Sequence, residues 1–176
     1  VHDAKVFSNS LVNNKLKMGH LIKTFSHLLP GYSKKPNYLI GDPAYPLTPN
    51  CMKEFQSCKN SAEVIFNNML RSARNPIECA FGRLRARWSI LTRKMDLKLE
   101  IIPKVPLTCF VLHNFCELHS SNIDEELVKC QIARNMAEET AHQNVPDPPY
   151  SSTTCEGETV RDTLVQYIYT HLPENY

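Results

Sequence analysis

Two carboxylates in the first half of the sequence occupy positions from which rigid elements could direct them toward a metal ion. Asp42 follows a short apolar run, residues 37–41, and Glu78 lies in a long arginine-rich helical segment, with 35 residues between the two acids. A carboxylate at a strand end and a carboxylate on a helix can share divalent ions, which stabilise the attacking and leaving oxygens of a phosphodiester. Mg²⁺ or Mn²⁺ suits such oxygen ligands. Spacing alone predicts no site, because any Asp and Glu lie some distance apart.

Basic residues gather around Glu78. Over residues 71–94 the only acid is Glu78, and the seven bases are Arg71, Arg74, Arg83, Arg85, Arg87, Arg93 and Lys94, although the net charge of the chain is only +2. Basic side chains fanning around a helix are suited to DNA phosphates, whose contacts position DNA and depend strongly on salt. The cluster is therefore a candidate DNA-binding surface, although composition alone does not establish it. A solubilising helix face would have the same composition, and that alternative stays open.

Several elements must position these residues. Residues 1–29 have a partial helical pattern, which predicts one or two short helices before Pro30 and Gly31 interrupt it. The run 37–41 predicts a buried strand with Asp42 at its carboxyl end, where ligands tend to bind. Residues 62–91 predict a helix that Pro76 must kink or restart.

The second half of the chain predicts three further helices. They are residues 105–119, apolar and expected to be largely buried; residues 124–142, polar; and residues 158–172. In the last helix an apolar stripe recurs every four residues, and its members are Val160, Leu164, Ile168 and Leu172, widened by Val165 and Tyr169. Residues 143–157, rich in Pro, Ser and Thr, predict a linker.

Four metal-capable side chains follow one another in the predicted helix 105–119. They are Cys109, His113, Cys116 and His119. Zinc accepts both residue types, but four ligands along one continuous helix span about 15 Å, which is too far for one tetrahedral ion. We therefore interpret these residues as core residues.

Four motifs follow one another along the first 120 residues. They are His2-Asp3-Ala4, Gly41-Asp42-Pro43-Ala44-Tyr45, Ile77-Glu78-Cys79-Ala80-Phe81-Gly82-Arg83-Leu84 and Leu112-His113-Asn114. In this order they resemble the Harbinger (PIF/Harbinger) family of DDE endonucleases. The second and third motifs together are specific, because both arise by chance in this order only rarely. A weaker motif, residues 157–164, resembles the terminal helix of that family.

The resemblance implies an α/β, RNase H-like fold in which three carboxylates hold divalent metal. Asp42 matches the second carboxylate and Glu78 the third. The first lies on a strand upstream of the His-Asp-Ala motif, so we expect an N-terminally truncated and therefore helix-dominated version of the fold. Asp3 is an alternative first ligand, although it matches the later His-Asp position and suits a helix N-cap.

The predicted function follows from this resemblance. It is a metal-dependent DNA endonuclease of transposase origin, with Mg²⁺ or Mn²⁺ as cofactor and DNA as partner. The family also implies a separate Myb-like DNA-binding partner and a nuclear location, with the cytoplasm as a second location. The alternative is a domesticated, non-catalytic DNA- or chromatin-binding protein, and a third interpretation is a decayed transposon relic.

Composition restricts the class of protein further. A chain of 176 residues with 42% hydrophobic residues suits one soluble domain, and seven unevenly spaced cysteines predict reduced thiols rather than a disulfide framework. No apolar run approaches the length of a membrane span. We expect residues 1–120 to form a partial endonuclease domain, residues 121–157 an acidic helix and linker, and residues 158–176 an amphipathic helix.

Overall fold

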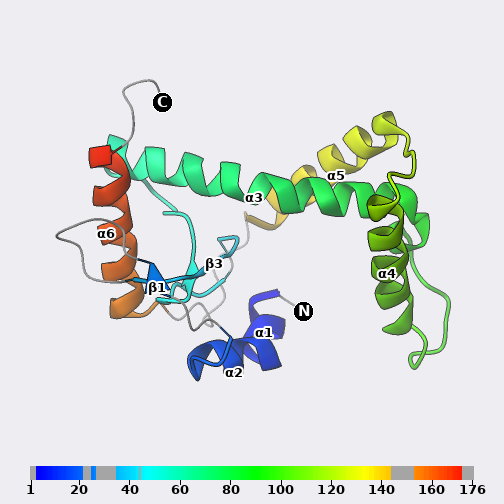
Figure 1. Cartoon of the computed structure of the whole chain (residues 1–176), viewed down its shortest axis with the longest axis horizontal. Coiled ribbons are helices and arrows are strands. Elements are labelled where there is room, and N and C mark those ends of the chain that lie inside the picture. The colour runs from blue at the N-terminus through cyan, green and yellow to red at the C-terminus, as the bar shows by residue number, and fades with distance from the viewer. Residues whose placement is uncertain (1–2, 22–24, 27–34, 44, 144–152, 172–176) are drawn as a thin grey trace. The chain divides into compact units, whose positions relative to one another are not determined.

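The computed structural model describes residues 3–21, 25–26, 35–43, 45–143 and 153–171 (Figure 1). Helices dominate these residues, as predicted. The chain packs as two compact units: the first unit joins residues 1–73 to residues 145–176, and the second unit is residues 74–144. The division into residues 1–120, 121–157 and 158–176 follows changes in composition and does not coincide with these two units. It stays a prediction.

The start of the chain contains the two short helices predicted for it, α1 (Asp3–Ser8) and α2 (Leu11–Lys17). Ser10 caps α2, because its hydroxyl accepts a hydrogen bond of 3.1 Å from the backbone N–H of Asn13. The helical pattern does not continue through residue 25, because β1 (Phe25–Ser26) pairs antiparallel with β2 (Lys35–Pro36). The rest of the predicted segment, residues 22–24 and 27–29, lies outside the described residues.

A parallel strand pair ends at Asp42. Strand β3 (Leu39–Ile40) pairs with β4 (Cys51–Met52), and the Gly41 N–H donates to the Met52 carbonyl at 2.9 Å. Strand β4 is buried, whereas Leu39 in β3 is 39% exposed. The prediction of a buried strand was therefore wrong for Leu39: side chains of a strand alternate between its two faces, and the described residues cover only one face of β3.

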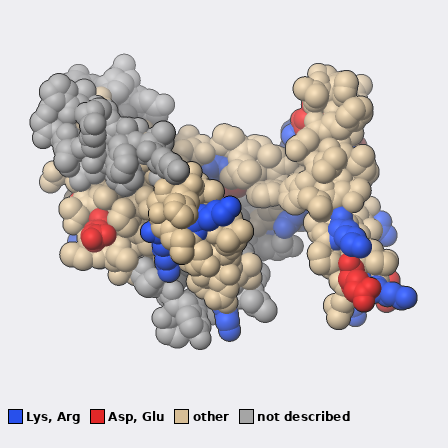
Figure 2. All heavy atoms as spheres, turned by 60° about the horizontal axis from the view of Figure 1, so that its bottom comes forward, with Lys and Arg blue, Asp and Glu red and all other residues tan. Residues whose placement is uncertain are grey.

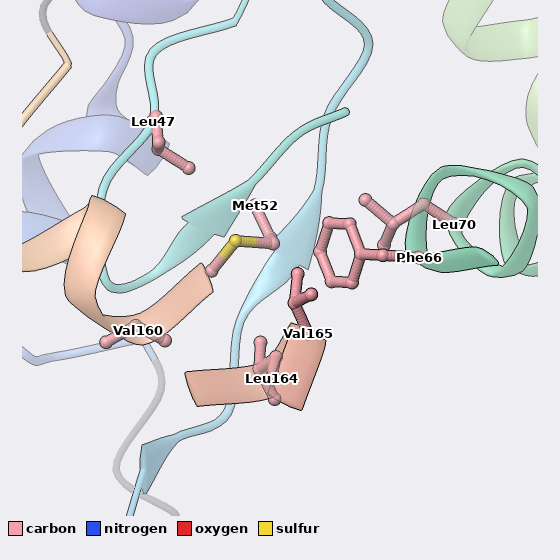
Figure 3. Packing of buried hydrophobic residues seen from close by; sticks show 7 residues of the cluster. All are labelled: Leu47, Met52, Phe66, Leu70, Val160, Leu164 and Val165. Carbon is pink, nitrogen blue, oxygen red and sulfur yellow. The ribbon is translucent and has the colours of Figure 1, made fainter. Parts of the chain in front are cut away.

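The core of the first unit lies where β4, α3 (Ser61–Arg87) and α6 (Cys155–His171) meet (Figure 3). Its buried members are Leu47, Met52, Phe66, Leu70, Val160, Leu164 and Val165. Burying one such side chain contributes about 1.5–3 kcal/mol. The predicted stripe of the last helix is confirmed at Val160, Leu164, Val165 and Ile168, but Tyr169 is 56% exposed, and Leu172 lies outside the described residues. The helix begins at Cys155, within the predicted linker.

The α6 helix approaches the segment after Asp42 at backbone distance. The Thr154 N–H donates to the Leu47 carbonyl at 3.0 Å. A Cβ atom on Gly157 would lie 2.8 Å from the Leu47 carbonyl oxygen and 2.8 Å from the Thr48 Cα atom. Only glycine fits between these two backbones without displacing one of them.

The second unit contains the end of α3, a 3₁₀ turn (Ser89–Thr92), α4 (Lys104–Leu118) and α5 (Glu125–Gln143). Gly82 on α3 is buried against Ile132 on α5, and the rings of Phe81 and Phe110 pack edge to face with centroids 6.4 Å apart. The small residue at position 82 therefore permits close packing of the two helices.

Helix α4 is far more exposed than predicted. Cys109 and His113 are buried, but Leu107, Val111, Phe115 and Leu118 are 61–80% exposed. The expectation of a largely buried helix was wrong, because α4 is apolar around most of its circumference and the described residues pack against one side only.

Helix α3 runs through Pro76 as one continuous α-helix, so it does not restart there. Proline has no N–H, so the Ser72 carbonyl four residues earlier lacks its usual helical donor. The division between the two units, at residues 73 and 74, falls within this turn. Among the described residues, no helix has the length and apolar character needed to cross a bilayer.

We predict that Gly157→Ala lowers the free energy of unfolding by about 1–3 kcal/mol, because the methyl group collides with backbone atoms that cannot rotate away. The gain in helix propensity, at most about 1 kcal/mol, offsets only part of this cost. Urea unfolding measures the change. Glu156→Ala, at an exposed position on the same helix, is the control. Equal unfolding midpoints for the two variants would contradict the close approach.

Candidate functional site

Asp42 lies in a tight turn directly after β3. The residue is partly buried, and its carbonyl oxygen accepts a hydrogen bond of 3.1 Å from the Tyr45 N–H. The ammonium of Lys53, a residue that is 5% exposed, donates to the Pro43 carbonyl at 3.0 Å. The turn that carries Asp42 is therefore fixed from two sides, by its own backbone and by a buried lysine that follows β4.

The electrostatics of Cys51 show that these groups are close neighbours. Burial raises the pKa of Cys51 to about 11, while the charge of Lys53 lowers it and the charge of Asp42 raises it. The sequence analysis did not identify Lys53. A lysine followed by a glutamate is typical of a solvated loop, and only the parallel pairing of β3 with β4 places Lys53 beside the Asp42 turn.

A second buried charge follows Lys53. Glu54 is 8% exposed, and one oxygen of its carboxylate accepts from Arg71 at 2.7 Å (Nη2) and 2.9 Å (Nε). Arg71, predicted to bind DNA, therefore joins the start of α3 to the segment after β4. Its side chain remains 61% exposed, so the guanidinium is still accessible to solvent.

Glu78 lies on α3 in the second unit and pairs with Arg74 one helical turn earlier, with 3.5 Å between Nη2 and Oε1. Both side chains are mostly buried, with 15% and 24% exposed. Asp42 belongs to the first unit and Glu78 to the second, so the close approach predicted for the two carboxylates stays a prediction. Asp3 is the first residue of α1, and its role as an alternative ligand also stays a prediction.

The side chains fit a divalent ion in type but not in number. Asp42 and Glu78 offer the oxygen donors that Mg²⁺ and Mn²⁺ prefer. Among the described residues, however, no three His, Cys, Asp or Glu side chains gather in a group that could hold a metal. The two carboxylates alone do not form the complete three-carboxylate site that the sequence implies.

The interpretation of the α4 Cys and His residues as core residues is confirmed at Cys109 and His113, which are buried. The core interpretation is wrong at His119, which is exposed and stacks on Phe115 with ring centroids 4.3 Å apart. Burial lowers the pKa of His113, and its Nδ1 atom has no hydrogen-bond partner among the described residues. All seven cysteines lie in the described part of the chain, and each is a free thiol.

The arginines near the end of α3 are engaged by acids of the second unit. Arg83 contacts Glu117 on α4 at 3.2 Å and Glu125 on α5 at 3.0 Å. Arg87 contacts the same Glu117 at 2.9 Å. Burial alone would raise the pKa of Glu117, but the hydrogen bonds and charges of the two arginines outweigh it and hold that pKa below its usual value.

The other predicted DNA-binding residues differ in their contacts. Arg85 donates to Asn135 on α5, and Arg93 donates to the Ser89 hydroxyl at 2.9 Å. Lys94 is exposed. Figure 2 shows basic and acidic side chains next to each other on part of the face in view. The sequence analysis counted bases against acids within residues 71–94, so it missed Glu117 and Glu125, which come from other helices.

Comparison with known proteins adds one finding. A family model described as DDE superfamily endonuclease matches residues 1–114. No curated protein and no solved structure matches the chain. The matched range contains Asp42, Glu78 and all seven basic residues of the predicted DNA-binding surface.

We predict that the Cys51 thiol makes stability depend on pH in alkaline solution. The thiol ionises near pH 9 in the unfolded chain but only near pH 11 in the folded chain. Above pH 9 the unfolded chain therefore binds fewer protons than the folded one, and stability falls as the pH rises from about 9 to 11, by roughly 2 kcal/mol.

Urea unfolding of the wild type and of Cys51→Ala across that range measures the effect. The variant should lose less stability with rising pH than the wild type. Cys155→Ala, at an exposed thiol, should follow the wild type. Parallel curves for all three proteins would show that Cys51 ionises normally in the fold.

Proposed function

Because the chain belongs to the DDE superfamily endonuclease family, we propose that it is a transposase-derived, metal-dependent DNA endonuclease of the Harbinger group. The observation that carries the proposal is the position of Asp42, which directly follows β3 in a parallel strand pair. Ligands bind at the carboxyl ends of such strands. The buried Lys53 holds the turn beside it.

In the proposed site, Asp42 and Glu78 supply two carboxylate ligands for Mg²⁺ or Mn²⁺. Such ions, when bound, activate water and stabilise charge on the phosphodiester oxygens. Glu78 must then exchange Arg74 for the ion, because the guanidinium now neutralises its carboxylate. The site also needs a third carboxylate, for which Asp3 is the alternative within this chain.

The proposed substrate is DNA, bound through phosphates by the basic residues of α3 and the segment after it. The Arg71 side chain is 61% exposed. Arg93 and Lys94 are also exposed. Contacts of this kind carry no sequence information. We therefore propose that target choice depends on a separate Myb-like partner protein and that the complex acts in the nucleus.

One observation favours the second candidate function, a non-catalytic DNA- or chromatin-binding protein. Arg74 lies 3.5 Å from the Glu78 carboxylate, so an ion pair already engages the side chain that a metal would need. A fold with this property can keep a DNA-binding surface without cleaving. Nicking activity separates the two functions.

We predict that the 176-residue chain alone nicks supercoiled plasmid weakly or not at all with Mn²⁺, because two carboxylates do not overcome the mutual repulsion of two closely spaced ions. In any longer version that does nick, Asp42→Ala or Glu78→Ala should reduce the nicking rate by at least about a hundredfold. Removal of a metal ligand costs more activity than removal of a residue that only orients a ligand.

The control for these variants is Asp96→Ala, which removes an exposed carboxylate outside the site. Circular dichroism establishes that each variant is folded. Strong nicking by the 176-residue chain that disappears in Asp3→Ala would assign the first ligand to Asp3. Unchanged nicking in Asp42→Ala would refute the proposed metal site.

A further inference from the structure

Arg83 and Arg87 differ from the other basic residues because they converge on one oxygen atom. Oε1 of Glu117 lies 3.2 Å from Nη2 of Arg83 and 2.9 Å from Nη2 of Arg87. The second oxygen, Oε2, accepts from Nε of Arg83 at 3.2 Å. Two guanidinium groups from adjacent turns of α3 therefore enclose a single oxyanion.

This geometry is suited to a phosphate as well as to a carboxylate. Residues four apart lie on the same side of a helix, and the planar fork of arginine matches the oxygen spacing of either anion. Arg74 pairs with Glu78 along its own helix, and Arg85 donates to Asn135. These acceptors are separate groups, whereas Arg83 and Arg87 share one carboxylate among the contacts of the described residues.

We propose that Arg83 and Arg87 form a binding site for one backbone phosphate of DNA, which Glu117 occupies until DNA displaces it. The inference rests on the DNA-binding function proposed above and deepens it. It replaces a diffuse basic surface with one defined contact, and it adds a competitor that belongs to the chain itself.

The donors of this site are not saturated by Glu117. The Arg87 side chain is 11% exposed, and its buried Nε atom has no hydrogen-bond acceptor among the described residues. Its Nη2 atom makes a long contact of 3.4 Å with the Ser121 carbonyl in addition to the ion pair. A phosphate group has more acceptor oxygens than a carboxylate and can satisfy more of these donors.

Glu117 is placed so that it can leave. Its side chain is 37% exposed and that of Glu125 is 65% exposed, whereas the two arginines are 29% and 11% exposed. Ion pairs at this degree of exposure contribute little to stability. A duplex offers many phosphates and gains free energy from released counterions, so it can replace the carboxylate without unfolding the helix.

Fluorescence anisotropy with a short duplex of mixed sequence, at several salt concentrations, tests the proposal on the 176-residue chain. Glu117→Gln keeps the shape of the side chain and removes its charge. We expect it to bind the duplex about threefold to tenfold more tightly than the matched control Glu126→Gln. Glu126 is an exposed neighbour on α5 that pairs with Lys129 at 2.8 Å, so its variant measures the general effect of removing one negative charge.

The salt dependence identifies the number of phosphates. The double variant Arg83→Ala with Arg87→Ala should weaken binding and reduce the slope of log affinity against log salt by about 1, because both arginines hold one phosphate. A reduction of about 2 would assign them to separate phosphates and overturn the inference. The slope of Glu117→Gln should equal that of the wild type, since the two arginines hold the same phosphate whether DNA displaces a glutamate or a glutamine.

Two further outcomes separate this inference from the proposed function. If the arginine variants leave affinity and slope unchanged, these arginines do not bind DNA and that part of the proposed function fails. If they weaken binding but Glu117→Gln equals Glu126→Gln, Glu117 is only a structural clamp. Should Glu117→Gln lower the thermal unfolding temperature below that of the assay, Glu125→Gln releases Nη1 of Arg83 alone. In that case Glu125→Gln should increase the affinity for DNA by a smaller factor. If the affinity does not increase, the inference is overturned.

Discussion

The first unit depends on the close contact between α6 and the backbone that follows Asp42. Gly157 permits this contact, and the hydrogen bond from Thr154 to Leu47 fixes its register. Behind it, Val160 and Leu164 complete the core around Met52. The parallel pair of two-residue strands is too short to be stable alone. The turn that carries Asp42 is therefore held in place by a helix from the other end of the chain.

In the second unit, ion pairs as well as apolar contacts link the helices. Glu117 joins α3 to α4, and Glu125 joins α3 to α5, both through Arg83. The Ile132 side chain on α5 also packs directly against the backbone of α3 at Gly82. Two of the residues proposed to bind DNA thus also pair with acids from neighbouring helices, although ion pairs at this exposure add little to stability.

The sequence predicted the helices well because each has a local signal. The apolar stripe of α6 and the Ser10 cap of α2 act over a few residues. Asp42 after a strand was predictable for the same reason. The burial of Lys53 and Glu54 was not, because it depends on which strand lies beside β3. The pairing of Arg83 with Glu117 joins positions 34 residues apart, and no helical periodicity reaches that far.

The exposure of α4 shows what an apolar run in the sequence cannot predict. An apolar run predicts a helix, but it does not determine how many sides of that helix are covered. Leu107 and Phe115 lie on sides that the described residues leave open. Within the described residues, only the face containing Cys109 and His113 has become part of a core.

The discontinuous first unit also has a consequence for synthesis on the ribosome. Met52 and Phe66 are translated long before Val160 and Leu164, with the whole second unit between them. At the usual elongation rate of about 5–20 residues per second, the early half of this core waits on the order of 5–20 seconds for its partner helix. During that interval its apolar side chains have no native cover, and a chaperone that binds short apolar segments would find them accessible. The second unit is contiguous in the sequence and is free to fold while the first is still waiting.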